Sequence, residues 1–140
     1  MSIFTQTGHQ ENDFWLVDGQ QEFAKFPANV IEGITDPLPI FLKVGNSKFG
    51  VKHIAARHSH WVKRHASSVQ ELVYLKLGQP GAIFSSEQDS KFKICLRLNP
   101  DALLVLNLFD RVGIPHFSVT SIYAMPSVVD GMRLGKFPGR

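Results

Sequence analysis

The sequence predicts an α+β domain, in which N-terminal helices pack on a mostly antiparallel sheet formed largely by the C-terminal half. Residues 51–65 contain neither Gly nor Pro, which favours a helix. Residues 91–98 alternate between apolar and mostly basic side chains, and residues 102–109 form an apolar run of strand length. Because the chain has 140 residues, we expect a single domain over residues 1–140.

The first third of the chain carries one helix signal and one strand signal. Residues 20–32 have apolar side chains at the spacing of a short amphipathic helix, which Gly33 would end. After the Asp-Pro-Leu-Pro sequence at 36–39, residues 40–44 are typical of a strand, and Gly45-Asn46 of the turn that follows it. The first dozen residues are polar, so we expect residues 1–36 to be frayed or to belong to an entry segment.

Two consecutive helices are expected in the middle of the chain. The first covers residues 51–65 and ends before Ser67-Ser68. The sequence Ser68-Val69-Gln70-Glu71 matches a capping box that begins a second helix, and Gly78 with Pro80 beyond it would end that helix.

Three strands are expected in the C-terminal half. Residues 91–98 predict a half-buried strand with a basic outer face, and residues 102–109 predict a central strand. Turns at 99–101 and 110–115 would lead into a last strand, His116–Tyr123. Periodicity alone also allows a buried helix over 102–109; we favour a strand because its neighbours pair with it through short connections.

Composition excludes several classes of protein. The chain is 44% hydrophobic and 19% charged, which argues against a disordered segment or a coiled coil. Its longest apolar run, 102–106, is far shorter than a membrane span, and we expect no signal peptide in the first twenty residues. Because Cys95 is the single cysteine, the chain has no internal disulfide and no thiolate zinc site.

Charge is distributed unevenly along the chain. Residues 37–70 contain no Asp or Glu but carry six Lys or Arg and four of the six His, whereas residues 1–36 have a net charge of −5. An acid-free basic segment of this kind fits a polyanion such as a nucleic acid backbone better than a neutral metabolite.

The histidines of residues 51–65 fall on two sides of the expected helix. A narrow cationic stripe holds four side chains at helical spacing: His53, Arg57, His60 and Arg64. His58 and His65 fall in the apolar arc. Such a stripe is also typical of a plain solvated surface. A metal site is less favoured, because imidazoles two or five residues apart do not share a helix face and the segment has no carboxylates.

Imidazoles next to fixed cations are the groups that RNA cleavage without a metal requires. One group takes the proton of the ribose 2′-OH, another protonates the departing 5′-oxygen, and a cation stabilises the charge of the phosphorane. In the last expected strand, a period of two places Ser121 and Tyr123 on one face, where a hydroxyl and a phenol can hold a phosphate, with Ser118, Thr120 and Ile122 on the other. The alternative is that these hydroxyls only decorate an edge strand.

Two short motifs carry a resemblance to a known family. The segment 50–58, Gly-Val-Lys-His-Ile-Ala-Ala-Arg-His, resembles the HI-x-x-RH helix of the barnase/EndoU/colicin/RelE-like ribonucleases. These include domains of phages and the C-terminal toxins of contact-dependent growth inhibition proteins. The segment 120–126, Thr-Ser-Ile-Tyr-Ala-Met-Pro, resembles their closing strand, in which Ser or Thr precedes Tyr by two. The order of elements is also similar over residues 38–126.

The resemblance implies a role for individual residues. It implies His53 as the main general acid/base, with Arg57 and Lys52 as cations that hold the phosphate or stabilise the transition state. The closing strand would supply Ser121 and Tyr123 as partners, or Thr120 in a shifted register. The second proton-transfer group stays open among His58, His60, His116 and Tyr123. Further substrate contacts are expected from the basic helix and the outer strand face: Lys52, His58, His60, Lys91, Lys93 and Arg97.

The resemblance also implies a biological setting. The expected activity is metal-independent cleavage of tRNA, with no cofactor, by a toxin domain whose catalytic core is residues 37–140. Such a domain is exported as the C-terminal part of a large cell-surface protein and acts in the cytoplasm of a target cell. An acidic immunity protein over the basic site is an expected partner, and a host activating factor stays open. Two other classes also stay open: an RNA-binding module without chemistry, and a hydrolase of a small phosphorylated ligand.

Overall fold

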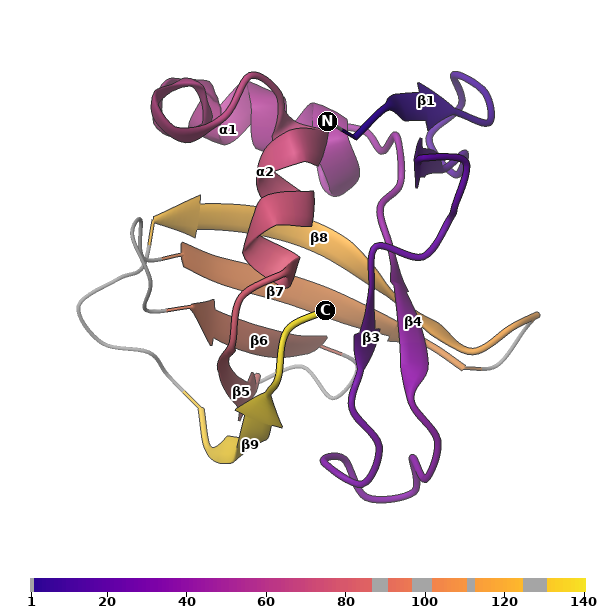
Figure 1. Ribbon diagram of the computed structural model, residues 1–140, viewed down its shortest axis with the longest axis vertical. Helices are drawn as coiled ribbons and strands as arrows, with labels where there is room; N and C mark the ends of the chain where they lie inside the picture. The colour runs from indigo at the N-terminus through magenta and orange to yellow at the C-terminus, as the bar shows by residue number, and fades with distance from the viewer. Residues whose placement is uncertain (1, 87–90, 97–101, 111–112, 125–130) are drawn as a thin grey trace.

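The computed structural model describes residues 2–86, 91–96, 102–110, 113–124 and 131–140, with residues 91–96 described by their backbone alone. Helices and strands are both present, with the strands mostly in the C-terminal half, so the predicted α+β class is confirmed (Figure 1). Neither described helix is long and apolar enough to cross a lipid bilayer.

Most of the described strands belong to one mixed sheet of seven strands, in the order β3-β4-β8-β7-β6-β5-β9. Strands β4 and β8 are parallel, and the other neighbours in this sheet are antiparallel. The bounds are β3 Ala24–Phe26, β4 Leu38–Phe41, β5 Gly81–Ser85, β6 Lys91–Leu96, β7 Ala102–Phe109, β8 His116–Ala124 and β9 Arg133–Phe137. Strand β9 was not predicted, so the expectation that β8 is the last strand is wrong.

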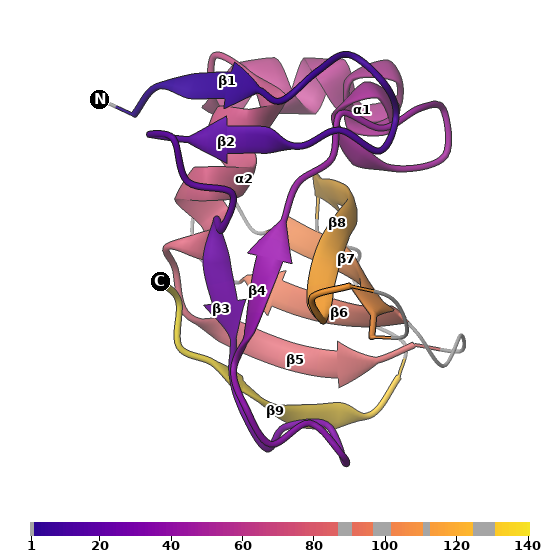
Figure 2. The same ribbon diagram turned by 90° about the vertical axis from the view of Figure 1, so that its right-hand side faces the viewer.

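The N-terminal segment is made of strands. Strands β1 (Phe4–Gln6) and β2 (Trp15–Val17) form a separate antiparallel pair beside α1 (Figure 2). The helix predicted over residues 20–32 is wrong, because residues 24–26 alternate buried, exposed and buried in β3. Asn29 and Gly33 then take positive φ angles of 62° and 86°, which interrupt any regular helix.

Aromatic side chains build much of the core. Phe23, Phe26, Phe117 and Phe137 are fully buried. The rings of Phe26 and Phe117 stack with their centroids 4.2 Å apart, which fixes β3 and β4 against β8. Residues 1–36 were expected to be frayed or entry-related, yet two of these buried rings come from that segment.

The helix α1 (Gly50–His65) follows β4 through a tight turn. Gly45 and Gly50 have φ angles of 80° and 76°, and a Cβ on either residue would lie within 3 Å of backbone atoms of the other side of the turn. The turn brings the carbonyls of Lys43 and Val44 to the first helical N–H groups, which donate to them at 3.1 Å. The predicted helix is confirmed, but the backbone leaves helical geometry at His58 (φ −131°, ψ 21°).

The second helix, α2 (Val69–Leu77), begins and ends where the sequence predicts. The Ser68 hydroxyl accepts a hydrogen bond from the backbone N–H of Glu71 at 3.2 Å, and Gly78 is the C-cap. The Glu71 carboxylate reaches back to Ser67, whose hydroxyl donates to it at 2.6 Å. The N-terminus of α2 is thus capped by two side-chain interactions, one from Ser68 and one from Glu71.

Strand β8 is only partly covered by its parallel neighbour. The register between β4 and β8 ends after Ile40↔Phe117 and Phe41↔Ser118. The chain then turns into α1, which packs along β8 where β4 no longer does (Figures 1 and 2). One face of α1 is thereby held against the C-terminal half of β8.

Strand β8 also contains an irregularity. Leu106 of β7 pairs with Val119, but Val105 pairs with Ser121, so that Thr120 is the additional residue of a β-bulge. Because the bulge resets the alternation, Ser118 lies on the same face of β8 as Ser121 and Tyr123. The prediction that Ser118 shares a face with Thr120 and Ile122 is therefore wrong.

The cap of α2 gives a first prediction. Replacing Ser68 by Ala removes the acceptor for the Glu71 N–H and should lower the free energy of unfolding by about 1 kcal/mol. Urea unfolding of both proteins measures this change. Thr35→Ala, which removes a hydroxyl at an exposed position, is the control and should hardly change the free energy of unfolding. Equal stabilities of wild type and Ser68→Ala would contradict the cap.

Candidate active site

Two histidines of α1 and a tyrosine of β8 meet where the helix crosses the strand. The His58 ring stacks on the Tyr123 ring with centroids 5.4 Å apart and planes inclined by 29°. The His53 ring meets His58 edge to face, with centroids 6.4 Å apart. The described structure therefore brings together three of the residues singled out from the sequence, although Tyr123 follows the two histidines by 65 residues or more.

His53 is held by the turn that precedes its helix. Its Nδ1 lies 2.8 Å from the carbonyl oxygen of Ser47, which can only accept a hydrogen bond. The proton therefore sits on Nδ1, and Nε2 is the atom that can exchange a proton with a ligand. The sequence could not reveal this contact, because a backbone carbonyl carries no residue signature.

His58 owes its position to the break in α1. With its backbone outside helical geometry, the second half of the helix starts in a new direction and the imidazole faces Tyr123. Burial lowers the pKa of His58, and the nearby charges of His53 and Arg57 lower it further. This imidazole is therefore neutral at neutral pH and able to accept a proton.

The cations of α1 line the exposed side of the helix. Lys52 and Arg57 are exposed, and Arg57 is close enough to His58 to act on its pKa. His60 and Arg64 are exposed too, but they lie beyond the break at His58. The single straight stripe predicted from a regular helix is therefore divided into two parts, with His53 and Arg57 before the break and His60 and Arg64 after it.

The closing strand contributes hydroxyls beside Tyr123. Ser121 is 6% exposed, and its Oγ is buried without a hydrogen-bond partner among the described residues. It lies two positions before Tyr123 on the same face of β8, as predicted. Thr120 sits in the bulge and is half-buried. A buried hydroxyl without a partner is costly in the free protein, and a ligand can satisfy it.

The basic residues expected on β6 are placed only in part. Arg97 lies outside the described residues, as do the side chains of Lys91 and Lys93. The backbone register places Lys93 opposite Val105, which in turn pairs with Ser121, and Lys91 opposite Asn107. Both lysines thus occupy register positions two strands away from the hydroxyls of β8.

His116, the remaining candidate for proton transfer, lies at the start of β8, at the opposite end of the strand from Tyr123. The structure therefore groups His58 and Tyr123 with His53, and separates His116 from them. Sequence reasoning overlooked Asn107, which pairs with Ser118 and whose Oδ1 is buried without a partner among the described residues. It could have been found from the sequence, because it is a single polar residue in the apolar run 102–109.

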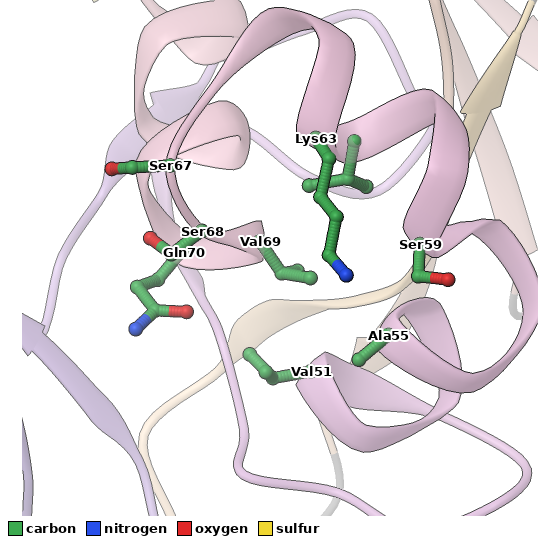
Figure 3. Close-up of a pocket in the computed structure, with 9 residues that line it drawn as sticks. Val51, Ala55, Ser59, Lys63, Ser67, Ser68, Val69 and Gln70 are labelled. Atoms are coloured by element: carbon green, nitrogen blue, oxygen red, sulfur yellow. The ribbon is translucent and has the colours of Figure 1, made fainter.

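A hollow of about 230 Å³ between α1 and α2 is a separate feature (Figure 3). Figure 3 shows Val51, Ala55 and Ser59 of α1 on one side of it and Ser67 to Gln70 on the other. Lys63 is the one ionisable residue among those that line it, and neither His53 nor His58 is among them. The hollow is therefore separate from the His53–His58–Tyr123 group.

Among the described residues, no group of three His, Cys, Asp or Glu side chains is placed to hold a metal ion. Comparison of the chain with models of protein families, with curated proteins and with solved structures finds no match. The functional assignment therefore depends on the geometry of the His53–His58–Tyr123 group and its surroundings.

Buried imidazoles make the stability of the fold dependent on pH. Burial lowers the pKa of His58 and of His116 below the ordinary value of about 6.5. As pH falls, the unfolded chain takes up protons at these groups first, so the free energy of unfolding should decrease between about pH 7.5 and pH 5. His58→Phe keeps a ring against Tyr123 and should show a smaller decrease.

Urea unfolding at the two pH values measures this difference. His9→Phe, at an exposed position, is the matched control and should follow the wild type. If His58→Phe loses as much stability as the wild type on acidification, His58 does not have the environment described above.

Proposed function

We propose that the chain is a metal-independent endoribonuclease that cleaves RNA by transesterification through the ribose 2′-OH. The observation that carries this proposal is the contact of His53, His58 and Tyr123 across α1 and β8, next to an exposed guanidinium in a segment without carboxylates. These groups are sufficient for acid/base catalysis at a phosphodiester.

The reaction assigns one role to each group. Neutral His58 takes the proton of the 2′-OH as the 2′-oxygen attacks phosphorus. His53 acts as the imidazolium: its Nδ1–H stays donated to the Ser47 carbonyl, and its Nε2–H passes to the 5′-oxygen as the P–O5′ bond breaks, which leaves His53 neutral and His58 protonated. Arg57 stabilises the phosphorane, and the Ser121 and Tyr123 hydroxyls hold its oxygens. The products are a 2′,3′-cyclic phosphate and a 5′-hydroxyl, so that protons and bonds balance.

The class of substrate and the biological role follow from charge and from the resemblance of the two motifs. The acid-free segment 37–70 is suited to a long polyanion, and we take tRNA as the substrate and a growth-inhibition toxin as the role. An acidic immunity protein bound over α1 and β8 would then block access by complementary charge.

Removing the His53 imidazole tests the reaction. His53→Ala should lower the rate of cleavage of total tRNA in EDTA by about 10²- to 10⁴-fold, because it removes a proton-transfer group. Cleavage is followed on denaturing gels, and mass spectrometry of the fragments identifies the cyclic phosphate.

His9→Ala is the matched control, since it removes an exposed imidazole far from the site in sequence, and should leave the rate unchanged. Full activity of His53→Ala would remove His53 from the mechanism. Intact tRNA after incubation with the wild-type protein, together with salt-dependent binding, would favour an RNA-binding module instead.

Replacing Ser121 by Ala should affect the activity of the protein but should not lower its stability. Because its buried Oγ has no hydrogen-bond partner among the described residues, Ser121→Ala should leave the free energy of unfolding unchanged or raise it. The same variant should cleave RNA more slowly, since it loses a hydroxyl that donates a hydrogen bond to the phosphorane. Urea unfolding and cleavage rates on one preparation measure both. A destabilised variant with normal activity would mean that Ser121 is a structural residue.

A further inference from the structure

Lys43 is a buried cation that has no counter-charge among the residues that the structure describes. It lies two residues after the end of β4 and is only 8% exposed. Its Nζ lies 4.2 Å from the ring centroid of Phe109, 5.8 Å from that of Phe49 and 5.9 Å from that of Phe14. Among the described residues, no carboxylate pairs with it, and burial lowers its pKa. The second buried lysine, Lys76, has a side-chain hydrogen bond instead: its Nζ donates to the Gln79 side chain at 3.3 Å.

An ammonium group in such a position is unfavourable in the free protein. Three aromatic rings offset part of the lost hydration through cation–π attraction, but they provide no negative charge. An anion that reaches Nζ would be attracted strongly, because the surroundings screen its charge weakly. Phe109 is 37% exposed, so this side of the cluster faces solvent.

His116 offers a second donor beside Lys43. Its ring stacks on Phe109 at 5.2 Å and packs against Phe41 at 4.8 Å. The Nδ1 atom lies 2.8 Å from the carbonyl oxygen of Ile114, while Nε2 is buried without a partner among the described residues. Burial lowers the pKa of His116 and the Lys43 charge lowers it further, against the opposing effect of the Ile114 carbonyl. A bound anion would offset the effect of the Lys43 charge on the pKa of His116. The ring could then take up a second proton, and Nε2 would donate it to the anion.

This cluster continues the face that carries the candidate active site. In the register of β7 and β8, Phe109 pairs with His116, Asn107 with Ser118, and Val105 with Ser121. Three of the described buried polar atoms without partners therefore lie along one face of this strand pair, on Asn107, His116 and Ser121. Unsatisfied groups are normally few and scattered, so their alignment indicates a ligand that spans this face.

We propose that Lys43 and His116 form a second phosphate subsite, which holds a phosphodiester of the RNA next to the one that is cleaved. The inference rests on the proposed function, because it takes the ligand to be RNA. Asn107 lies between the two subsites and contacts the intervening nucleotide. Lys43 and His116 bind substrate and take no part in proton transfer.

Lys43→Met tests the subsite, because Met fills the aromatic cluster without a charge. The probe is a single-stranded 2′-O-methyl RNA, which cannot undergo transesterification. The slope of log binding constant against log salt concentration should become less negative by about 0.7 to 1 for Lys43→Met. Lys25→Met, at an exposed position on β3, is the matched control and should keep the wild-type slope.

Stability distinguishes the subsite from a purely structural role. Lys43→Met should unfold at a higher urea concentration than the wild type, since an uncompensated charge is removed. A structural cation–π role would instead give a less stable variant with an unchanged salt slope, and this result would overturn the proposal.

Inorganic phosphate provides a test that is independent of RNA cleavage. At constant ionic strength, replacing chloride by phosphate should shift the ¹H and ¹⁵N resonances of the His116 ring in the wild type and should leave them unchanged in Lys43→Met. Unshifted His116 resonances in the wild type would overturn the subsite, whether or not the protein cleaves RNA. A second result would also overturn it: the wild type responds to phosphate, but Lys43→Met binds RNA with the wild-type salt slope. That combination would show an anion site that RNA does not contact. Failure of cleavage alone, with both responses present, would refute the ribonuclease activity and leave the subsite standing.

Discussion

The short pairing of β4 with β8 is the constraint on which the rest of the site depends. Two register pairs, at Phe117 and Ser118, join the strands before the chain leaves the sheet. The tight turn through Gly45 and Gly50 then directs α1 along the remaining length of β8. A longer β4 would place a strand where the helix now lies, and the imidazoles of α1 would not meet the phenol of Tyr123.

The same turn connects packing with chemistry. It supplies carbonyls to the first N–H groups of α1 and to the Nδ1 atom of His53, so that helix position and imidazole tautomer are fixed by one piece of backbone. Lys43 lies at the beginning of this turn, with its ammonium among aromatic rings. Residues that face the two ends of β8 are therefore positioned by a segment of about ten residues.

Local signals predicted much of this fold. The helix predicted over 51–65, the Ser68 cap and the strands at 102–109 and 116–123 depend on nearby residues, and they are found where the sequence indicates. Strands β5 and β9 were not predicted. The strand at 24–26 was mistaken for a helix, because the burial of Ala24 and Phe26 on one face is set by contacts with distant strands.

The site was predictable in its composition but not in its geometry. His53 and Tyr123 could be named from motifs. Their connection through His58 depends on a break in α1, and no Gly or Pro in the sequence indicates that break. The bulge at Thr120, which aligns Ser118 with Ser121, is likewise a property of strand pairing. That Lys43 lies among aromatic rings, with no carboxylate beside it in the described part of the chain, becomes evident only when the residues around it are known.

The most direct test of the central claim is a double-mutant cycle between His53 and Tyr123 in kcat/KM for RNA cleavage. If both side chains serve one transition state, His53→Ala combined with Tyr123→Phe should be little slower than the slower single variant. Effects of the two substitutions that multiply in full would show that the groups act independently, and would contradict a shared active site.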